Sequence, residues 1–407
     1  MGQANGVYVD RNMLTYKQAI EKVLEHSFPL KSRRLRFWES LGLVASRDLI
    51  SHEPFPSFDN SAVDGYAISS LSDKKGQMAL EVQGEIRAGE CFRGILRPGC
   101  AVRIFTGAQV PRGAQAVVMQ EDTERVNGHV FLLKRPSAKE NVRFAGEDVQ
   151  KGEVIVWRST LLNASHLAVL AAVGYEKVPV FPPPKIAILA TGSELLKAGK
   201  KLKPGKVRDC NSILLQALVE KDGGIPNLLP TVGDNLAKIR VLVRKGLRND
   251  ILLIAGGVSV GKYDFVREVL KKEGVREIFW KVDIKPGKPI FFGIKNQTLV
   301  FGLPGNPVSV FVTFQEFVRP AIFKMMGKND HTGGEQVEGY LTKPFQNGSR
   351  LHFVRVHCVR GRKGYLVTPL KGQGSHMIGS LAASNGILKV EPNRLLRKNE
   401  RLSVKII

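Results

Sequence analysis

Three acidic residues follow glycine-containing turns at the ends of three predicted strands. Glu194 follows a Thr-Gly-Ser turn, Asp234 follows a single glycine, and Asp264 closes the stretch GGVSVGKYD. In an open α/β sheet, ligands bind beyond the carboxyl ends of the strands, so the three carboxylates are candidates for one site. Each acid taken alone could instead stabilise a helix N-terminus, a role that Asp commonly fills.

The stretch from Gly256 to Lys262 matches the first seven positions of a phosphate-binding P-loop, G-x-x-x-x-G-K. It lies between a predicted strand and a predicted helix, as a P-loop does. The eighth position holds Tyr263, where a P-loop has the Ser or Thr that binds Mg²⁺. The sequence therefore argues against a nucleoside triphosphatase and supports only a turn that faces a phosphate.

Two further segments have the chemistry of an oxyanion site. Lys281, Lys285 and Lys288 occur within eight residues, in a loop whose prolines and glycine restrict the backbone. Lysine ammonium groups hold oxyanions as point charges, although this loop could also be an exposed basic turn. The rigid turn from Pro304 to Pro307 directly precedes a predicted helix, whose first N–H groups favour an anion. Together with the three acids, these segments predict a metal-plus-phosphate site.

Other signals of chemistry are weak. Three polar loops, at 59–66, 106–108 and 141–148, could be no more than turns. The eight histidines show no paired metal-ligand spacing, and sequence separation alone supports no catalytic nucleophile. The cysteines form no CxxC pair, so we do not expect a structural zinc site. These cysteines are Cys91, Cys100, Cys210 and Cys358.

The segment from 185 to 326 has the pattern of an α/β sheet. Apolar strand-like runs alternate there with helical patterns, which requires a mostly parallel sheet covered on both faces. The predicted strands are 186–190, 227–232, 250–255 and 298–303. The predicted helices are 212–219, 236–247, 265–272 and 308–326.

The patterns before residue 185 predict two helices and a β-rich domain. One helix runs from Thr15, a candidate N-cap, toward Pro29, and the other covers 164–173. Between 58 and 147, short β-like runs are broken by glycines. These runs are 80–82, 101–105, 116–119 and 130–133. The stiff Pro182-Pro183-Pro184 segment marks a domain boundary.

A small β domain is expected at the C-terminus. The composition of 328–335 is that of a linker, and strand-like runs follow it. The expected strands are 351–359, 365–368, 387–390 and 402–406.

Composition limits the class of protein. The 407 residues are 43% hydrophobic and 24% charged, with a net charge of +24, as in a folded multidomain protein with a basic surface. No nucleic-acid-binding motif accompanies this charge, so we expect no specific nucleic-acid partner. The N-terminus lacks the apolar core of a signal peptide, and no apolar run approaches membrane-spanning length. We therefore expect a cytoplasmic protein without a membrane association.

Eight ordered motifs resemble the molybdopterin molybdenumtransferase family, which includes the bacterial enzyme of molybdenum cofactor synthesis and the E domain of gephyrin. The resemblance runs from about residue 15 to residue 406. The motifs are FDNSAVDGYA (58–67), RIFTGAQVP (103–111), NVRFAGEDV (141–149), ATGSEL (190–195), GGVSVGKYDF (256–265), IKPGKP (284–289), GLPGNP (302–307) and GQGSHMIGSLAASNG (372–386).

The resemblance implies a fold and an activity. The expected fold is multidomain, α/β plus β: a three-layer α/β/α molybdopterin-binding domain (183–328), an inserted β-rich domain (58–145), a discontinuous N-terminal linker domain (1–57 and 146–182) and a C-terminal β-barrel (335–407). The implied reaction inserts molybdate into adenylylated molybdopterin, with Mg²⁺-dependent release of AMP. The implied assembly is a homodimer with a composite active site. The upstream adenylyltransferase and recipient molybdoenzymes are expected contacts.

The resemblance also implies roles for single residues. Carboxylates that would bind Mg²⁺ and support P–O cleavage are Glu194, Asp234 and Asp264. Residues that would hold the molybdate and terminal phosphate are Lys281, Lys285, Lys288 and Ser375. Residues of the adjoining turns that would contact substrate are Thr191, Gly192, Ser193, Gly257, Ser259, Pro304, Asn306 and Pro307. Residues expected to act from the facing subunit are Asp64, Thr106, Arg143 and Asp148, with Asp59 a weaker candidate.

Two positions depart from the family pattern. Lys262 stands where family members often have an acid, and Gln115 stands where Asp is common. Both changes remove negative charge, and Lys262 would alter the electrostatics near Asp264. Two other functions stay open: the molybdopterin adenylyltransferase of the same pathway, and a non-catalytic molybdopterin-binding scaffold. The sequence does not separate molybdate from tungstate.

Overall fold

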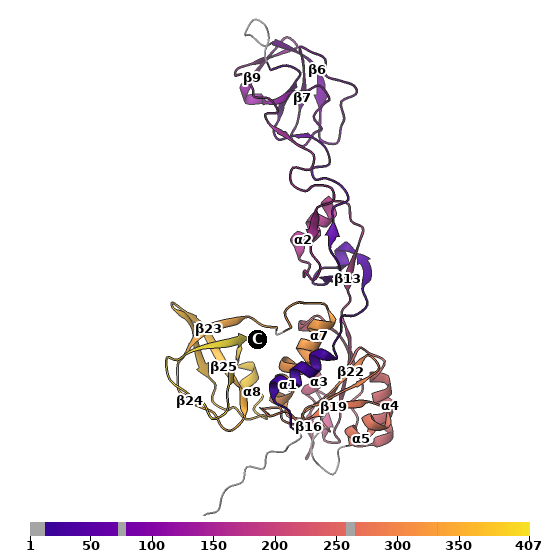
Figure 1. Ribbon diagram of the computed structural model, residues 1–407, viewed down its shortest axis with the longest axis vertical. Helices are drawn as coiled ribbons and strands as arrows, with labels where there is room; N and C mark the ends of the chain where they lie inside the picture. The colour runs from indigo at the N-terminus through magenta and orange to yellow at the C-terminus, as the bar shows by residue number, and fades with distance from the viewer. Residues whose placement is uncertain (1–12, 72–78, 258–264, 332) are drawn as a thin grey trace, which may run out of the picture. The chain divides into compact units, whose positions relative to one another are not determined.

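The computed structural model describes residues 13–71, 79–257, 265–331 and 333–407 (Figure 1). Ser259, Lys262 and Asp264 lie outside these ranges. The chain divides into two compact units. The first contains 1–33, 42–46 and 180–407, and the second contains 34–41 and 47–179. Each unit is described below by itself.

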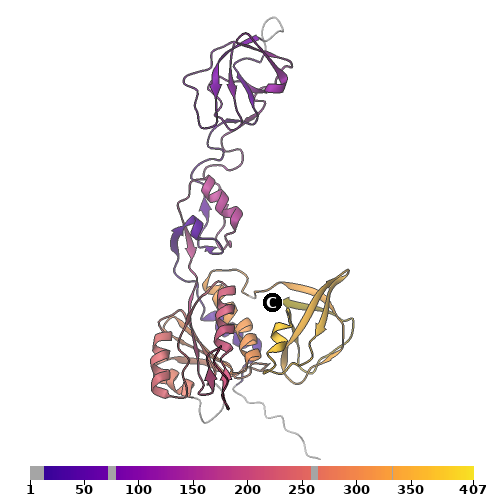
Figure 2. The same cartoon turned by 180° about the vertical axis from the view of Figure 1, so that it is seen from behind.

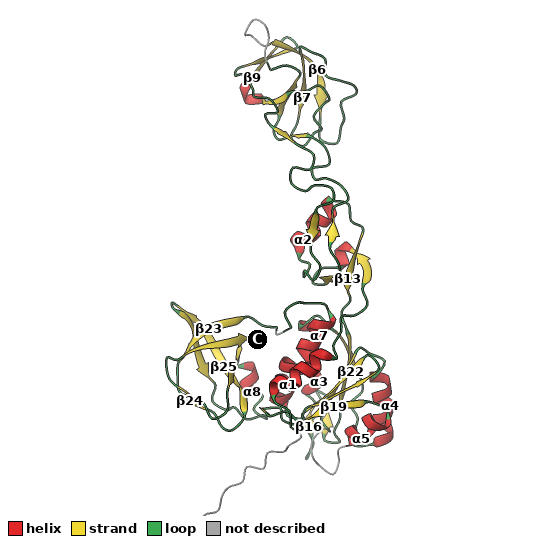
Figure 3. Cartoon of the chain, viewed as in Figure 1, coloured by secondary structure: helices red, strands yellow, loops and turns green. Residues whose placement is uncertain are grey.

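A six-stranded sheet forms the centre of the first unit, in the order β17-β14-β18-β22-β21-β19 (Figure 3). The first four strands are parallel, β21 is antiparallel to β22, and β19 is antiparallel to β21. The bounds are β14 (Lys185–Ala190), β17 (Ile225–Leu228), β18 (Ile251–Ala255), β19 (Arg276–Trp280), β21 (Phe291–Lys295) and β22 (Thr298–Leu303). The sequence predicted the parallel strands and missed the antiparallel pair.

Helices cover both faces of this sheet, which confirms the three-layer prediction. Alternate residues of β14 point to opposite faces, so Ile186 and Ile188 join one apolar core while Ala187 and Leu189 join the other. The first core contains residues of α1 (Tyr16–Glu25), α3 (Asn211–Lys221), α6 (Pro307–Thr313) and α7 (Arg319–Met325). The second contains residues of α4 (Leu236–Gly246) and α5 (Phe265–Lys272), which lie on the other side (Figure 2).

Helix ends agree with the sequence patterns in two places and differ in a third. Thr15 caps α1 through a hydrogen bond from the Gln18 N–H, in a capping box. Helix α2 (Ala164–Ala172) begins after the N-cap Asn163. The predicted single helix over 308–326 is instead α6, a π-helical turn from Phe314 to Val318, and α7.

The C-terminal domain is a closed five-stranded barrel, as predicted. Its sheet runs β20-β25-β26-β23-β29-β27, and β27 also pairs with β25, which closes the barrel. Their bounds are β20 (Ile284–Lys285), β23 (Gln336–Leu341), β25 (Leu351–Gly361), β26 (Gly364–Pro369), β27 (Gly386–Val390) and β29 (Arg401–Ile406). The loop between β26 and β27 carries α8 (Gly379–Ala382), and β24 (Phe345–Gln346) pairs with β28 (Leu395–Leu396).

The second unit contains the inserted β-rich domain. Its sheet has the order β8-β5-β7-β6-β10-β9. The bounds are β5 (Gly65–Ile68), β6 (Ala79–Ile86), β7 (Cys100–Ile104), β8 (Ala116–Met119), β9 (Thr123–Val126) and β10 (His129–Leu132). Alternate residues of β5 and β7 enter two separate apolar clusters, so both faces of the sheet are covered.

Short strands complete the two units. In the second unit, β4 (Asn60–Ser61) pairs with β11 (Val142–Arg143), and β3 (Leu49–Ile50) pairs with β12 (Val154–Val156). The chain passes between the units near β1 (Arg33–Arg36), β2 (Val44–Ala45) and β13 (Lys177–Phe181). Near the candidate site, β15 (Leu195–Leu196) pairs with β16 (Val207–Arg208). None of the helices in the described ranges is long and apolar enough to span a membrane.

Candidate functional site

A cavity of about 810 Å³ lies at the carboxyl ends of three neighbouring parallel strands. Thr191 follows β14, Gly256 follows β18 and Pro304 follows β22, and all three line the cavity. This is the edge of an α/β sheet where ligands bind. The predicted site residues in its wall are Thr191, Gly192, Glu194, Asp234, Gly257, Pro304, Asn306 and Pro307.

The structure brings the Glu194 and Asp234 turns together. The Ser193 N–H donates to Asp234 Oδ2 (3.4 Å), and the Asp234 N–H donates to Ser193 Oγ (2.9 Å). Gly192 has a φ of +151°, and a Cβ there would come within 2.5 Å of Glu194 Oε1. A side chain at 192 would therefore displace the Glu194 carboxylate, which explains why the turn needs glycine.

Thr191 presents a buried hydroxyl without a partner. Thr191 is 5% exposed, and its Oγ1 has no hydrogen-bond partner among the residues that the structure describes. Gly257 has a φ of +66°, and a Cβ there would lie 2.9 Å from this oxygen. Since a buried polar atom without a hydrogen bond costs free energy, the hydroxyl is a candidate to bond a ligand in the cavity.

The turn from Pro304 to Pro307 contacts the C-terminal domain. Asn306 Nδ2 donates to Ser375 Oγ (3.0 Å), and the Val308 N–H donates to the Ser375 carbonyl (3.2 Å). Asn211 Nδ2 donates to the Gly305 carbonyl (2.7 Å). The structure therefore places Ser375 beside the predicted turn, although Ser375 itself is not part of the cavity wall.

The three predicted lysines lie in a hairpin next to this cavity and not in its wall. The Val282 and Ile290 N–H groups both donate to the Lys288 carbonyl (3.0 Å each), and Pro289 lines the cavity. Lys281 places its Nζ 4.3 Å from the centroid of the Trp280 ring. Lys285 lies on β20, which pairs with β25 of the barrel.

Two buried basic side chains near Lys285 were missed by the sequence analysis. Arg355 is fully buried and donates to Ser380 Oγ (2.7 Å) and to the Gly372 carbonyl (3.0 Å), while its Nη1 has no partner. Burial lowers the pKa of Arg355 to about 10. His352 lies opposite Lys285, and burial, followed by the Lys285 and Arg355 charges, lowers its pKa to about 4. The sequence signal that could have pointed to Arg355 is an arginine within a predominantly apolar strand.

Asp209, Asn211 and His376 also line the cavity without having been predicted. Asp209 is buried, and it accepts hydrogen bonds from the Ser212 N–H (3.0 Å) and Oγ (2.6 Å) at the start of α3. This arrangement resembles a helix cap, for which Asp is favoured. The signal in the sequence was therefore an acid before a helix, which by itself does not distinguish a cap from a site residue.

In the second unit, Asp64 and Thr106 form a hydrogen-bonded pair. Asp64 Oδ1 accepts from the Thr106 N–H (2.8 Å) and from Thr106 Oγ1 (2.7 Å). The backbone bond, and then the hydroxyl bond, lower the pKa of the Asp64 carboxyl. Both residues are exposed. The structure therefore holds a carboxylate, in its charged form, at the surface of this unit.

The other candidates of the second unit lie on neighbouring loops. Asp59 Oδ1 accepts from the Ala145 N–H (2.9 Å), and Arg143 pairs with Asn60 in the β4–β11 ladder. Asp148 donates its N–H to the Phe55 carbonyl (3.2 Å). Asp59 and Arg143 therefore belong to one loop cluster, while the structure gives no side-chain contact between Asp148 and the other candidates in its described ranges.

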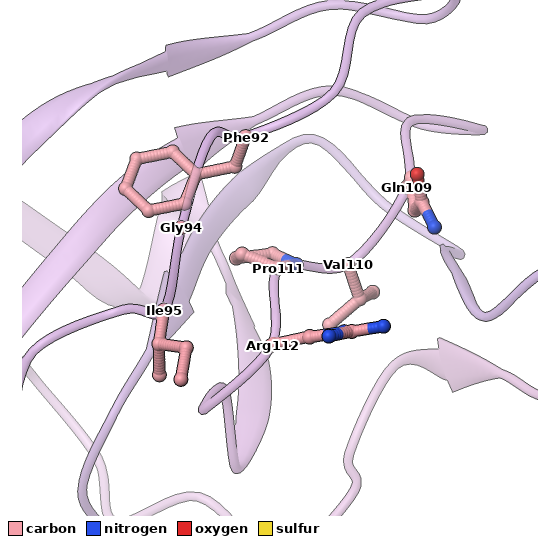
Figure 4. A pocket seen from close by; sticks show the side chains of 7 residues that line it. All are labelled: Phe92, Gly94, Ile95, Gln109, Val110, Pro111 and Arg112. Carbon is pink, nitrogen blue, oxygen red and sulfur yellow. The ribbon is translucent and has the colours of Figure 1, made fainter.

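A separate cavity of about 270 Å³ lies in the inserted domain (Figure 4). Gln109, Val110 and Pro111, the end of the predicted 103–111 motif, line it together with Phe92 and Arg112. None of the predicted site residues lines this cavity. The motif therefore has two structural parts, because its Thr106 bonds Asp64 while its last residues shape this pocket.

The carboxylates of the larger cavity fit a hard divalent cation. Within the described ranges, no group of three or more His, Cys, Asp or Glu side chains could hold a metal ion. Mg²⁺ is usually bound by one or two carboxylates together with waters and substrate phosphates. Glu194 and Asp234, on adjacent turns of one cavity, match that donor set.

Three family descriptions match successive parts of the chain. "MoeA N-terminal region (domain I and II)" matches residues 14–174. "Probable molybdopterin binding domain" matches 187–324, which includes the α/β sheet and the cavity turns. "MoeA C-terminal region (domain IV)" matches 338–407, the barrel.

Individual proteins match over nearly the whole chain. The molybdopterin molybdenumtransferase of Haemophilus influenzae is 36% identical over 387 residues, covering 94% of this chain and 95% of that protein. The one from Nostoc is 40% identical over 298 residues, covering 71% and 68%. A crystal structure of a molybdopterin biosynthesis MoeA protein from Pyrococcus horikoshii has a TM-score of 0.84 and 30% identity, covering 97% of this chain and 99% of that one. The chain therefore belongs to the MoeA family of molybdopterin molybdenumtransferases, enzymes of molybdenum cofactor biosynthesis.

Proposed function

We propose that this enzyme inserts molybdenum from molybdate into adenylylated molybdopterin and releases AMP in a Mg²⁺-dependent reaction. The observation that carries the proposal is the cavity of about 810 Å³, whose wall combines Glu194, Asp234 and the turn before α6. A cavity of this size can hold a nucleotide-sized ligand. Its position beyond the strand ends is where α/β sheets bind such ligands.

Glu194 and Asp234 would hold Mg²⁺ in the cavity, together with Asp264 from outside the described ranges. When bound, Mg²⁺ supplies charge stabilisation at the phosphate oxygens of the substrate. The protein's own contribution is to position the two carboxylates. The reciprocal Ser193–Asp234 hydrogen bonds join the two turns, which holds the Asp234 carboxylate beside the turn that carries Glu194.

The remaining wall groups would bind the substrate. The unpartnered Thr191 hydroxyl offers a hydrogen bond, and Gly192 and Gly257 let the backbone approach closely. Lys285, Lys288 and Lys281, with Ser375, would hold the molybdate and the terminal phosphate. The buried guanidinium of Arg355 fixes the loop that carries Ser375, through hydrogen bonds to the Gly372 and Gly374 carbonyls. Ser259 belongs to the same substrate set.

We propose in addition that the active enzyme is a homodimer with composite sites. Asp64, Thr106, Arg143 and Asp148 would be contributed by the second copy, as the family resemblance implies. The charged state of Asp64, maintained by Thr106, supports a role toward a cationic or proton-donating group of the substrate complex.

A mixing experiment tests the composite site. Glu194→Gln and Asp64→Asn alter different surfaces, so each homodimer should be impaired, by about a hundredfold for the first and about fivefold to tenfold for the second. After subunit exchange, a heterodimer carries one intact and one doubly altered site, and random mixing should restore about a quarter of wild-type activity. Activity that stays at the level of the separate variants after verified exchange would refute a shared site.

The reaction itself is tested with purified protein, adenylylated molybdopterin, Mg²⁺ and molybdate. AMP release and reconstitution of a cofactor-free molybdoenzyme are followed together. The proposal expects AMP release that requires molybdate and yields active cofactor. ATP consumption with unadenylylated molybdopterin would instead identify an adenylyltransferase, and pterin binding without either reaction would identify a scaffold. Parallel reactions with tungstate show which oxyanion is preferred.

A further inference from the structure

The loop that joins β15 to β16 is strongly basic. Between Leu195 and Arg208 the chain has six Lys and Arg residues and no Asp or Glu. All of these basic residues except Lys206 are exposed. We call residues 197–208 the basic loop. Its charged residues are Lys197, Lys200, Lys201, Lys203, Lys206 and Arg208.

The basic loop begins next to the cavity wall and ends in it. Leu195, just before it, and Arg208, at its end, line the cavity. Lys206 Nζ donates to the Ser193 carbonyl (2.6 Å), and Arg208 Nε donates to the Lys200 carbonyl (3.3 Å). Lys206 therefore fastens the loop to the turn that carries Ser193, and Arg208 fastens the end of the loop to its middle. These two bonds keep the other four basic residues beside the cavity.

The four other lysines keep their charge unneutralised. Within the described ranges, none of Lys197, Lys200, Lys201 and Lys203 takes part in an ion pair with an acid. Basic side chains elsewhere do find such partners: Lys272 pairs with Glu268 on α5, for example. The basic loop is therefore a concentrated source of positive potential in the first unit.

A positive potential beside the cavity would offset the acidic side chains in its wall. Its wall contains the acids Glu194, Asp209 and Asp234, whose negative potential opposes the entry of a phosphate-bearing substrate. Clustered charge of the opposite sign at a cleft raises the local concentration of a charged substrate and its association rate. Such an effect falls as salt screens the charges.

We propose that the basic loop captures the phosphate-bearing substrate electrostatically and steers it into the cavity past the acidic wall. This inference rests on the proposed function, because it assigns the loop to the substrate of that reaction. The lysines would act before chemistry, on the association step. They would therefore set kcat/KM for the pterin nucleotide and leave kcat unchanged.

The test uses charge changes at two exposed lysines of the loop. In the full-length enzyme, Lys200 and Lys201 are both replaced by Glu, and in a second variant both are replaced by Gln. The matched control is Arg362→Glu with Lys363→Glu, in the exposed turn between β25 and β26, which alters the net charge equally and does not line the cavity. Initial rates are measured with the pterin nucleotide as the varied substrate, from low to high salt.

We expect the Glu variant to lower kcat/KM about tenfold at low ionic strength, and the Gln variant about threefold, with kcat unchanged. The differences should shrink as salt is raised, because screening removes the effect in the wild-type enzyme too. The kcat/KM of the control variant, with Glu at 362 and 363, should stay within about twofold of the wild-type value. Unchanged kcat confirms that the variants are folded. An unaltered kcat/KM at low salt, or an equal decrease in the control, overturns the proposal.

Equilibrium binding of AMP by calorimetry separates this inference from the reaction proposal. Weaker AMP binding by the Glu variant at low salt supports capture even if the wild-type enzyme shows no turnover, in which case the proposed reaction alone is wrong. AMP binding that is identical in wild type and the Glu variant overturns capture. A defect seen only when an adenylyltransferase delivers the substrate, and not with free substrate, would also overturn it, because the loop would then dock a protein.

Discussion

The candidate residues of the two units are held in place in different ways. In the first unit, groups near the site are buried, and burial is the main cause of the lowered pKa values of His352 and Arg355. In the second unit, Asp64 is exposed, and hydrogen bonds from Thr106 are the main cause of its lowered pKa. The first unit therefore provides a preformed cavity, while the second holds a charged carboxylate at its surface.

The largest expected effect is at the carboxylates of the cavity. Glu194→Gln or Asp234→Asn should reduce AMP release by about a hundredfold or more, since each would remove a carboxylate ligand of the proposed Mg²⁺. Asp264→Asn is expected to behave in the same way. Rates of AMP release at saturating substrate measure this, while circular dichroism confirms the fold. Glu268→Gln, an exposed carboxylate on α5, is the control, and near-normal turnover of the cavity variants would remove these acids from the site.

A smaller effect is expected at the proposed oxyanion-binding residues of the first unit. Lys285→Ala or Lys288→Ala should raise the molybdate concentration needed for half-maximal rate by about tenfold to thirtyfold, because one cation is lost from the oxyanion site. Ser375→Ala should act in the same direction through the lost contact with Asn306. Lys271→Ala, at an exposed residue of α5, is the control. An unchanged molybdate requirement excludes the altered residue from this role.

Substitutions at Asp64 and Thr106 in the second unit should have weaker effects on kcat/KM, and the two effects should not be additive. Asp64→Asn and Thr106→Ala should each lower kcat/KM by about fivefold to tenfold, and the double variant should be hardly worse than Asp64→Asn, since both remove one hydrogen-bonded arrangement. The measurement is a double-mutant cycle on turnover. If the two fold-decreases in kcat/KM multiply in the double variant, Asp64 and Thr106 act independently. The hydrogen bonds from Thr106 would then not be what makes Asp64 effective.

The smallest expected effect concerns pH and stability. His352 is neutral in the folded state because its pKa is about 4, whereas the unfolded chain has a His pKa of about 6.5. The unfolded state therefore binds more protons between these values, so stability falls as the pH is lowered through this window. Between pH 7 and pH 5 we expect a loss of about 2 kcal/mol in the unfolding free energy.

Denaturant unfolding at both pH values, compared between wild type and His352→Gln, checks this. The variant should lose less stability than wild type on acidification, even if it is less stable at pH 7. An identical pH dependence in both proteins would show that His352 is not the group responsible.

Much of the fold was predictable because its elements carry local patterns. The parallel strands have uninterrupted apolar runs, and α5 was predicted over its observed length, Phe265–Lys272. Strands β19 and β21 were missed, since their mixed runs, such as REIFW, do not show the pattern of a strand buried on both faces. The predicted helix over 308–326 contains a π-helical turn, which has no local sequence signal comparable to a cap.

The candidate site was predictable only in part. Glu194 and Asp234 could be proposed because each lies in a turn after a strand of one sheet, and strand order brings such turns together. Asp209 and His376 could not, because their local sequence is compatible with a cap or a loop. Arg355 stands in an apolar strand run, but its burial also depends on the loop that packs over it.

The sequence by itself determined the alternation of strands and helices, the glycine turns with their acids and the family to which the chain belongs, because these depend on neighbouring residues and ordered motifs. Only the tertiary structure decided which groups share one cavity. Asn306 donates to Ser375, which is 69 positions away, and Leu196, just before the basic loop, pairs with Arg208 at its end. Such contacts are set by the packing of whole domains, whose apolar cores fix the loops that approach each other.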